Sequence, residues 1–214
     1  MSSRGRIGRW RLIGAGAAGI FLIASVFSIV TLISVRSVTP YEETHPIVDY
    51  PEDYRTAEHI ATTVAKAWDS DARLVRSGGV VHCTARDQLA SGLRFEFGAS
   101  KFFFGFPRVS FARVTIEPET NLVTIVAEPT DMFGQPAALD TKLIALDLED
   151  ALTVADKNGG AQFLREHPAC SIGFSLYDYT WRLRYAADLR DYQNNNLRFE
   201  IDSRTGGLLS TSSE

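Results

Sequence analysis

The sequence predicts an α+β protein in which one transmembrane helix precedes two modules, each combining a helix with an antiparallel sheet. Three observations carry this prediction. Residues 12–35 contain no Asp, Glu, Lys or Arg. Two helical patterns of apolar residues are each followed by a series of strand patterns. Gly134 and Pro136, with Pro129 shortly before them, mark a break between the two series.

The boundaries follow from these patterns. We expect a cytoplasmic N-terminus at 1–11, a transmembrane helix at 12–35, a linker at 36–53, a first α+β module at 54–130, a second linker at 131–141 and a second α+β module at 142–214. Three prolines and five acidic residues indicate that the linker at 36–53 is extended.

The apolar segment 12–35 has the length of a membrane span. At about 1.5 Å of rise per residue, its 24 residues would form a helix of roughly 36 Å, enough to cross a hydrocarbon core of about 30 Å. Four arginines precede it and acidic residues follow it, which predicts a cytoplasmic N-terminus and an exported C-terminal part. Since no A-x-A site follows, we expect an uncleaved signal anchor in the cell membrane.

The stretch "GAGAAG" inside this segment satisfies the G-x-G-x-x-G pattern of dinucleotide-binding proteins. That motif requires a preceding strand and an acidic residue about 20 positions later, where this chain has Ser34. We therefore expect no nucleotide and no other cofactor. The small residues instead indicate a face on which another transmembrane helix can pack: Gly14, Ala15, Ala18 and Gly19.

Charge separates the anchor from the exported part. Beyond residue 36 there are 17 basic and 26 acidic residues, a net charge of about −9. An acidic domain is poorly suited to polyanions, so nucleic acid is not an expected partner.

Helical periodicity is clear in two places. Apolar residues recur at spacings of three and four over residues 54–68. A second helix is predicted around Leu148–Ala155, with Asp147 as its N-cap and Asp150 three residues on. Strand patterns follow both helices, and the alternation of Trp181, Leu183 and Tyr185 with arginines predicts a strand with one wet face.

The second half, about 142–210, resembles a PepSY-like domain. The resemblance rests on "LDLEDALTVADKNGGAQF", "TWRLRYA" and "LRFEIDSRTGGLL", which match a helix, an aromatic strand and a closing D-x-x-T-G turn. Asp202, Thr205 and Gly206 are its structural turn, although Gly207 stands where the family often has an acid. The resemblance implies a modulatory or chaperone-like module of exported or membrane proteins and no catalytic residues.

The only two cysteines, Cys83 and Cys170, leave two alternatives open. An exported domain permits a disulfide between them, and two separately buried thiols explain them equally well.

No catalytic or metal-binding motif emerges from the sequence. The four histidines lack metal-ligand spacing, and adjacent His82 and Cys83 on a strand would face opposite sides.

"KFFFGFPRVSF" is the most unusual exported segment, and two alternatives explain its aromatic residues. Either they fill the core, or they form an exposed partner patch of Phe103, Phe104 and Phe106.

The sequence therefore predicts a non-catalytic, single-pass membrane protein that binds another membrane or exported protein, as a regulator or as an accessory subunit. The alternative is a VirB8-like or other NTF2-like assembly component of a secretion or envelope complex. That alternative predicts one continuous curved sheet with a long N-terminal helix. An enzyme would need a pocket with convergent titratable groups.

Overall fold

The computed structural model describes residues 41–47, 51–103, 106–117, 120–133, 137–187 and 196–213, with the side chains of 85–91, 101–103, 106–108 and 128–133 excepted. Residues 40–214 form one compact unit. Within the described residues, no helix is long and apolar enough to cross a bilayer, and the predicted span at 12–35 lies outside them.

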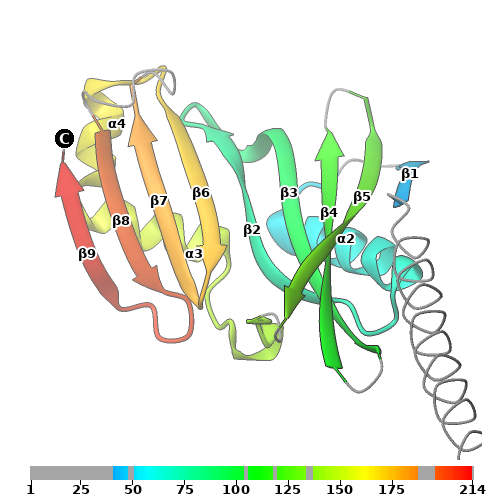
Figure 1. Cartoon of the computed structure of the whole chain (residues 1–214). Coiled ribbons are helices and arrows are strands. Elements are labelled where there is room, and N and C mark those ends of the chain that lie inside the picture. Colours follow the sequence, from blue (N-terminus) through cyan, green and yellow to red (C-terminus); the bar gives the residue numbers. More distant parts are fainter. Residues whose placement is uncertain are drawn as a thin grey trace, which may run out of the picture. The chain divides into compact units, whose positions relative to one another are not determined.

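In its described residues this unit has nine strands, three α-helices and two short helical turns (Figure 1). The strands are β1 Tyr41–Pro46, β2 Arg73–His82, β3 Ala85–Phe103, β4 Phe106–Glu117, β5 Leu122–Phe133, β6 Ser171–Tyr177, β7 Thr180–Ala186, β8 Asn196–Asp202 and β9 Leu208–Ser213. The helices are α2 Tyr54–Trp68, α3 Leu148–Ala155 and α4 Ala161–Glu166, with a 3-10 turn η1 Thr141–Leu143 and a kinked segment η2 Asp156–Gly160 that joins α3 to α4.

The prediction of two separate helix-plus-sheet modules is wrong. All nine strands form one antiparallel sheet in the order β1-β5-β4-β3-β2-β6-β7-β8-β9. The two halves join where β2 pairs with β6, from Arg76 opposite Tyr177 to His82 opposite Ser171. Strand β2, which follows α2, thus hydrogen-bonds to β6, which follows α4. Neither half therefore keeps a sheet of its own.

A further difference concerns the segment 36–53, which was expected to be a linker. Its residues Tyr41–Pro46 form β1, which pairs with β5 along six residues. Pro46 is the last residue of the strand, where a missing backbone donor does little harm.

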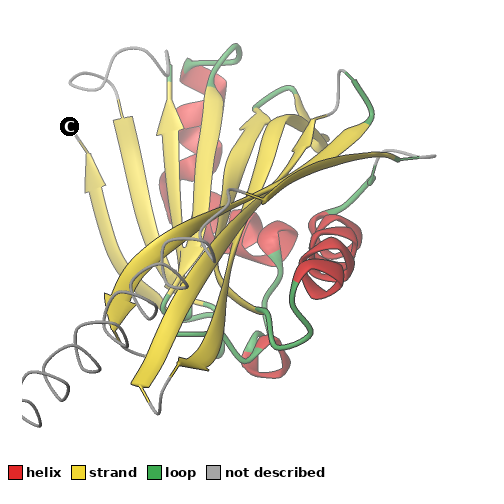
Figure 2. Cartoon of the chain, turned by 45° about the vertical axis from the view of Figure 1, so that its right-hand side comes forward, coloured by secondary structure: helices red, strands yellow, loops and turns green. Residues whose placement is uncertain are grey.

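The helices α2, α3 and α4 lie on the same side of the sheet, and no described helix covers its other face, which we call the open face (Figure 2). Helix α2 has the predicted bounds, and the side chain of Asp53 caps it by accepting a hydrogen bond from the Thr56 N–H at 2.7 Å. Helix α3 begins with the predicted capping box of Asp147 and Asp150. Each capping interaction satisfies backbone donors that the first helical turn leaves unpaired.

One aromatic cluster explains why the two halves share a core. The buried Tyr54 ring of α2 lies 5.8 Å from Phe95 of β3, 6.2 Å from Phe174 of β6 and 5.1 Å from Trp181 of β7, measured between ring centroids. Helix α2 therefore buries its first turn against strands from both halves. Separating them would expose these rings, each of which contributes about 1.5–3 kcal/mol or more when buried.

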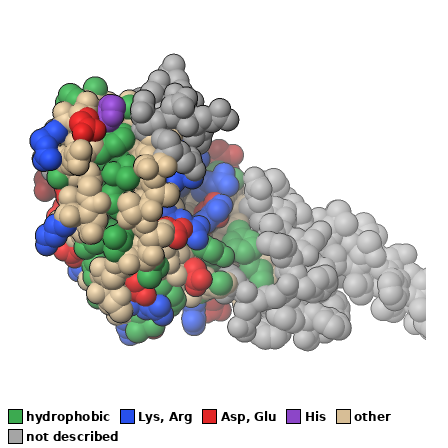
Figure 3. All heavy atoms as spheres, turned by 90° about the vertical axis from the view of Figure 1, so that its left-hand side faces the viewer, with side chains coloured by type: hydrophobic (Ala, Val, Ile, Leu, Met, Phe, Trp, Pro, Cys, Tyr) green, Lys and Arg blue, Asp and Glu red, His purple; other side chains and the backbone are tan. Residues whose placement is uncertain are grey.

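The two edge strands differ in character. Strand β1 carries Glu42, Glu43 and Pro46, which are features that discourage pairing with another sheet. All six residues of β9 are exposed and uncharged. Figure 3, which views the side where the C-terminus lies, shows mainly backbone and uncharged polar side chains in the middle of this face, with hydrophobic side chains among them.

Candidate ligand-binding site

The open face of the sheet carries a groove above the junction of the two halves. Its floor consists of small residues from β2, β3 and β6: Gly78, Gly92, Gly173 and Ser175. A Cβ atom built at Gly92 or Gly173 would meet no atom within 4 Å, so both positions open toward solvent. We call this surface the junction groove. It comprises two adjoining hollows of about 610 and 540 Å³ that share Gly79 and Ser175.

Arginines stand on both sides of this floor. The six that line the junction groove are Arg76, Arg94, Arg113, Arg182, Arg184 and Arg198. They face outward because they alternate with core residues, as Arg182 and Arg184 do with the buried Trp181 and Leu183. The register confirms that the two sides belong to one face, since Arg94 opposes Gly78, Gly78 opposes Ser175, and Ser175 opposes Arg182.

Among the described lining residues, two carboxylates accompany these six arginines, those of Glu96 and Glu200. Glu96 accepts hydrogen bonds from Arg76 at 2.6 and 2.7 Å, and its other neighbour is Arg113 at 3.6 Å. The hydrogen bond from Arg76, helped by the charges of Arg76 and Arg113, lowers the pKa of Glu96 below its ordinary value. Glu96 is therefore ionised at neutral pH and holds two arginines in place.

The opposite side of the groove is organised in a similar way. Glu200 lies 3.2 Å from the Arg182 guanidinium and accepts a hydrogen bond from the Ser210 hydroxyl at 3.2 Å. Arg184 donates to the Asn196 side-chain oxygen at 3.1 Å, and Asn196 is buried. These contacts fix the directions of the guanidinium groups while the Arg182 side chain remains 54% exposed.

Arg94 differs from its neighbours. Its side chain is exposed and makes no ion pair or hydrogen bond with any described residue. Its charge is therefore available to a ligand without breaking an existing contact.

The groove is positive on an otherwise acidic domain. Its six arginines and two glutamates give a net charge of +4. The two segments that contain the helices, 51–72 and 137–169, carry eleven acidic and five basic residues, a net of −6. The groove thus has the charge sign opposite to that of the helical side.

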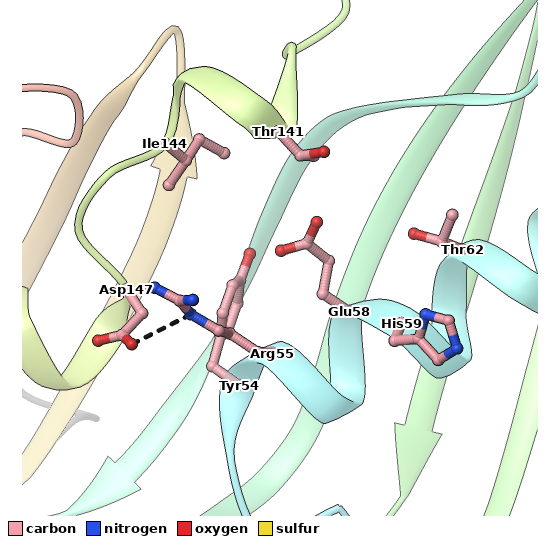
Figure 4. Close-up of a pocket in the computed structure, with 8 residues that line it drawn as sticks. All are labelled: Tyr54, Arg55, Glu58, His59, Thr62, Thr141, Ile144 and Asp147. Atoms are coloured by element: carbon pink, nitrogen blue, oxygen red, sulfur yellow. Dashed lines mark ion pairs between the residues drawn. The ribbon is translucent and has the colours of Figure 1, made fainter.

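A separate hollow, of about 320 Å³, lies on the helical side, between α2 and the segment around η1 (Figure 4). Arg55 pairs with Asp147 across it at 3.2 Å, and the Glu58 carboxylate extends toward Thr141. The His59 ring turns away from Glu58 in this view. Glu58 makes no hydrogen bond or ion pair with any described residue.

Burial perturbs two titratable groups of this hollow. Burial raises the pKa of Glu58 above its ordinary value, and the charge of Arg55 opposes that shift. Burial also raises the pKa of Tyr54, whose hydroxyl is hydrogen-bonded to Ser77. The hollow gathers titratable groups, but its described residues do not form the hydrogen-bonded nucleophile and base that covalent catalysis needs.

The two cysteines lie beside the strand junction. A disulfide joins Cys83, just after β2, to Cys170, just before β6, with 5.3 Å between their Cα atoms. The Cys83 N–H also donates to the Cys170 carbonyl at 3.1 Å. Of the two alternatives left open by the sequence, the structure has the bridge.

The described part of the chain contains no assembled metal site and no cluster of histidines. His82 lies 3.5 Å from the Ser171 hydroxyl at the end of the β2–β6 pair. No group of three potential metal ligands occurs among the residues that the structure describes.

The predicted turn residues lie where the chain reverses from β8 to β9: Asp202 ends β8, and Thr205 and Gly206 follow it. The Asp202 carboxylate accepts from the N–H groups of Arg204 at 2.8 Å and Thr205 at 3.2 Å, and the Gly206 N–H donates to the Asp202 carbonyl at 2.8 Å. Gly206 has φ = +75°, which favours glycine. These residues shape the chain reversal and do not line the groove.

Two predicted sites cannot be placed by their side chains, which lie outside the described part of the structure. The first is the helix-packing set in the transmembrane segment, Gly14, Ala15, Ala18 and Gly19. The second is the aromatic patch, Phe103, Phe104 and Phe106, whose side chains are not described. Both stay predictions.

The junction groove was missed at the level of sequence. Its signal is visible in retrospect as arginines at outward positions of several strands, together with glycines in β2 and β6. The sequence does not show that β2 pairs with β6. This pairing brings the two groups of arginines together.

Comparisons of the chain with protein-family models, with curated proteins and with solved structures found no match.

Proposed function

We propose that the chain is a single-pass membrane-anchored exported protein whose folded domain binds another protein on the open face of its sheet, without catalysis. It would act as a regulator or accessory subunit of a membrane complex. The observation that carries this proposal is the junction groove, where a glycine-rich floor between arginines spans strands from both halves of the domain.

Binding suits the groove because its surface is already organised. The guanidinium groups of Arg76 and Arg182 are held by Glu96 and Glu200, so little conformational entropy is lost when a partner contacts them. The floor residues Gly92 and Gly173 leave space for a partner backbone to approach closely.

A role as an assembly component of a secretion or envelope complex, of the VirB8-like or NTF2-like kind, is the second candidate. The feature in its favour is the continuous sheet with α2 packed across it, which that alternative predicts. Both candidates are binding functions, and they differ in whether the partner is one protein or an oligomeric envelope assembly. The PepSY-like resemblance of residues 142–210 stays a prediction.

The test uses the tagged full-length protein, extracted from membranes of its native host with a mild detergent. Three forms are compared: the unmodified protein, Gly173→Tyr and Ala67→Tyr. Gly173→Tyr places a bulky side chain over the floor of the groove, where the added Cβ meets no atom within 4 Å. Ala67→Tyr is the matched control, because Ala67 is exposed on α2.

We expect the unmodified protein and Ala67→Tyr to retain the same stoichiometric partner, and Gly173→Tyr to lose it. A single partner would favour the accessory role, and a high-mass assembly of several proteins would favour the assembly component. A clean monomer in the unmodified protein would contradict both. Retention by Gly173→Tyr would place the binding surface elsewhere on the domain.

A further inference from the structure

The chemistry of the junction groove indicates what kind of partner it fits. We propose that the groove binds an acidic polypeptide segment, with carboxylates that pair with Arg94 on one side and with Arg182 and Arg184 on the other. This inference rests on the proposed function, since it names the chemistry of the partner at the same surface.

Charge complementarity is the first argument. A net charge of +4 is concentrated in the described lining of one groove, on a domain that carries a net charge of about −9 as a whole. Guanidinium groups bind carboxylates through two parallel hydrogen bonds, which lysines cannot reproduce. All six cations of the groove are arginines.

The availability of Arg94 is the second argument. It projects from the centre of the sheet and has no partner among the described residues, whereas Arg76 and Arg113 share Glu96. A ligand carboxylate at Arg94 would add an ion pair without displacing one. Such a contact is exposed, so it is screened by salt.

The dimensions of the groove suit a polypeptide chain. Arg94 and Arg182 lie on strands that are three positions apart in the sheet, which corresponds to roughly 14 Å at about 4.8 Å per strand. Between them lie Gly78 and Ser175, whose side chains are absent or small. An extended chain along β2 and β6 fits this width, with side chains that reach either wall.

The two glutamates of the groove argue for a polypeptide over nucleic acid or a membrane of anionic lipids. Glu96 and Glu200 interrupt the positive surface, and the domain as a whole carries a net charge of about −9. A continuous row of phosphates would be repelled by both. A polypeptide can place carboxylates opposite the arginines and neutral residues opposite the glutamates.

The test measures binding of a fluorescein-labelled octaglutamate probe to the full-length protein in a neutral detergent, by fluorescence anisotropy. An octaglutamine probe of equal length controls for non-specific contact. Arg94→Gln removes the available charge, Arg94→Lys keeps the charge but loses the planar fork, and Arg165→Gln removes an exposed arginine of α4 as the matched control.

We expect octaglutamate to bind and octaglutamine not to bind. Arg94→Gln should weaken the affinity for octaglutamate by about twofold to fivefold, the size expected for the loss of one exposed ion pair. The affinity of Arg94→Lys for octaglutamate should lie between that of the unmodified protein and that of Arg94→Gln. Arg165→Gln should leave the affinity unchanged. Raising the salt from 50 to 500 mM should weaken binding.

Several outcomes would overturn the inference. These are equal binding of both probes, no binding of octaglutamate, or an affinity that Arg94→Gln leaves unchanged. Arg94-dependent binding of a labelled octathymidylate without octaglutamate binding would identify a nucleic acid, and the same result with anionic-lipid nanodiscs would identify a membrane surface. Self-association that Arg94→Gln abolishes would identify the acidic helical side of a second copy as the occupant.

The two proposals fail in different ways. If a native partner is lost with Gly173→Tyr but octaglutamate does not bind, the binding function stands and the acidic chemistry is wrong. If octaglutamate binds through Arg94 but no native partner is retained, the chemistry stands and the accessory role is wrong.

Discussion

Cys83 and Cys170 form a disulfide at the end of the strand pair that joins the two halves of the sheet. The bridge links residues 87 positions apart, so in the unfolded state it closes a long loop. It therefore stabilises the one contact between strands that makes the nine strands a single sheet.

Reduction of this disulfide should destabilise the domain strongly. In the chain-entropy description, a loop of this length corresponds to about 4–5 kcal/mol of unfolding free energy. We expect the urea midpoint of the oxidised protein to fall when a reductant is added. The double variant Cys83→Ala/Cys170→Ala should start from the lower midpoint and should not respond to the reductant. An oxidised protein that is insensitive to the reductant would contradict the stabilising role.

The buried pair of Tyr54 and Ser77 predicts a thermodynamic coupling between α2 and β2. Both residues are at least 95% buried, and their hydroxyls are hydrogen-bonded to each other. Tyr54→Phe and Ser77→Ala should each cost about 1–2 kcal/mol, because each leaves a buried hydroxyl without this partner. The double variant should cost less than the sum of the two, as measured by urea unfolding. Additive costs would show that the hydrogen bond does not couple the two elements.

The position of Glu58 leads us to expect that the free energy of unfolding depends on pH. Burial raises its pKa in the folded state, so the folded protein binds this proton more tightly than the unfolded chain does. Its contribution to stability is therefore complete below the unfolded pKa and is lost as the pH rises through the folded pKa. We expect Glu58→Gln to raise the urea midpoint at pH 7 and to leave it unchanged near pH 3.

The control for this experiment is Glu52→Gln, because Glu52 is exposed. It should change the midpoint equally little at both pH values. A Glu58→Gln variant that is no more stable than the unmodified protein at pH 7 would mean that the carboxylate is better solvated than its position suggests.

We predict that position 206, occupied by glycine, does not tolerate a side chain. Its φ of +75° disfavours other residues, and an added Cβ would lie 3.2 Å from the Leu146 side chain. Gly206→Ala should cost about 1–2 kcal/mol by thermal or urea unfolding. The matched variant Gly92→Ala, where the Cβ meets nothing within 4 Å, should change stability by less than about 0.5 kcal/mol. Equal effects of the two variants would refute this account of the turn.

The local elements were largely predictable from the sequence. The periodicity of residues 54–68 predicted α2, and Asp147 with Asp150 predicted the start of α3, because helix faces and caps depend on residues close in the chain. Strand β1 was not predicted, since its apolar content is low and its stability comes from hydrogen bonds to β5. The groove could not be predicted for a related reason, because its walls come from strands of both halves.

By itself the sequence determined which residues turn outward, since alternation places Arg182 and Arg184 opposite the buried Trp181 and Leu183. It also determined the charge of the part beyond residue 36 and the positions of the two cysteines. Only the tertiary structure decided that β2 pairs with β6, that one sheet replaces two, and that Arg94 and Arg182 share one groove. The physical reason is that a strand's hydrogen-bonding partner is chosen by its backbone edges and by the core beneath them, and side-chain alternation specifies neither.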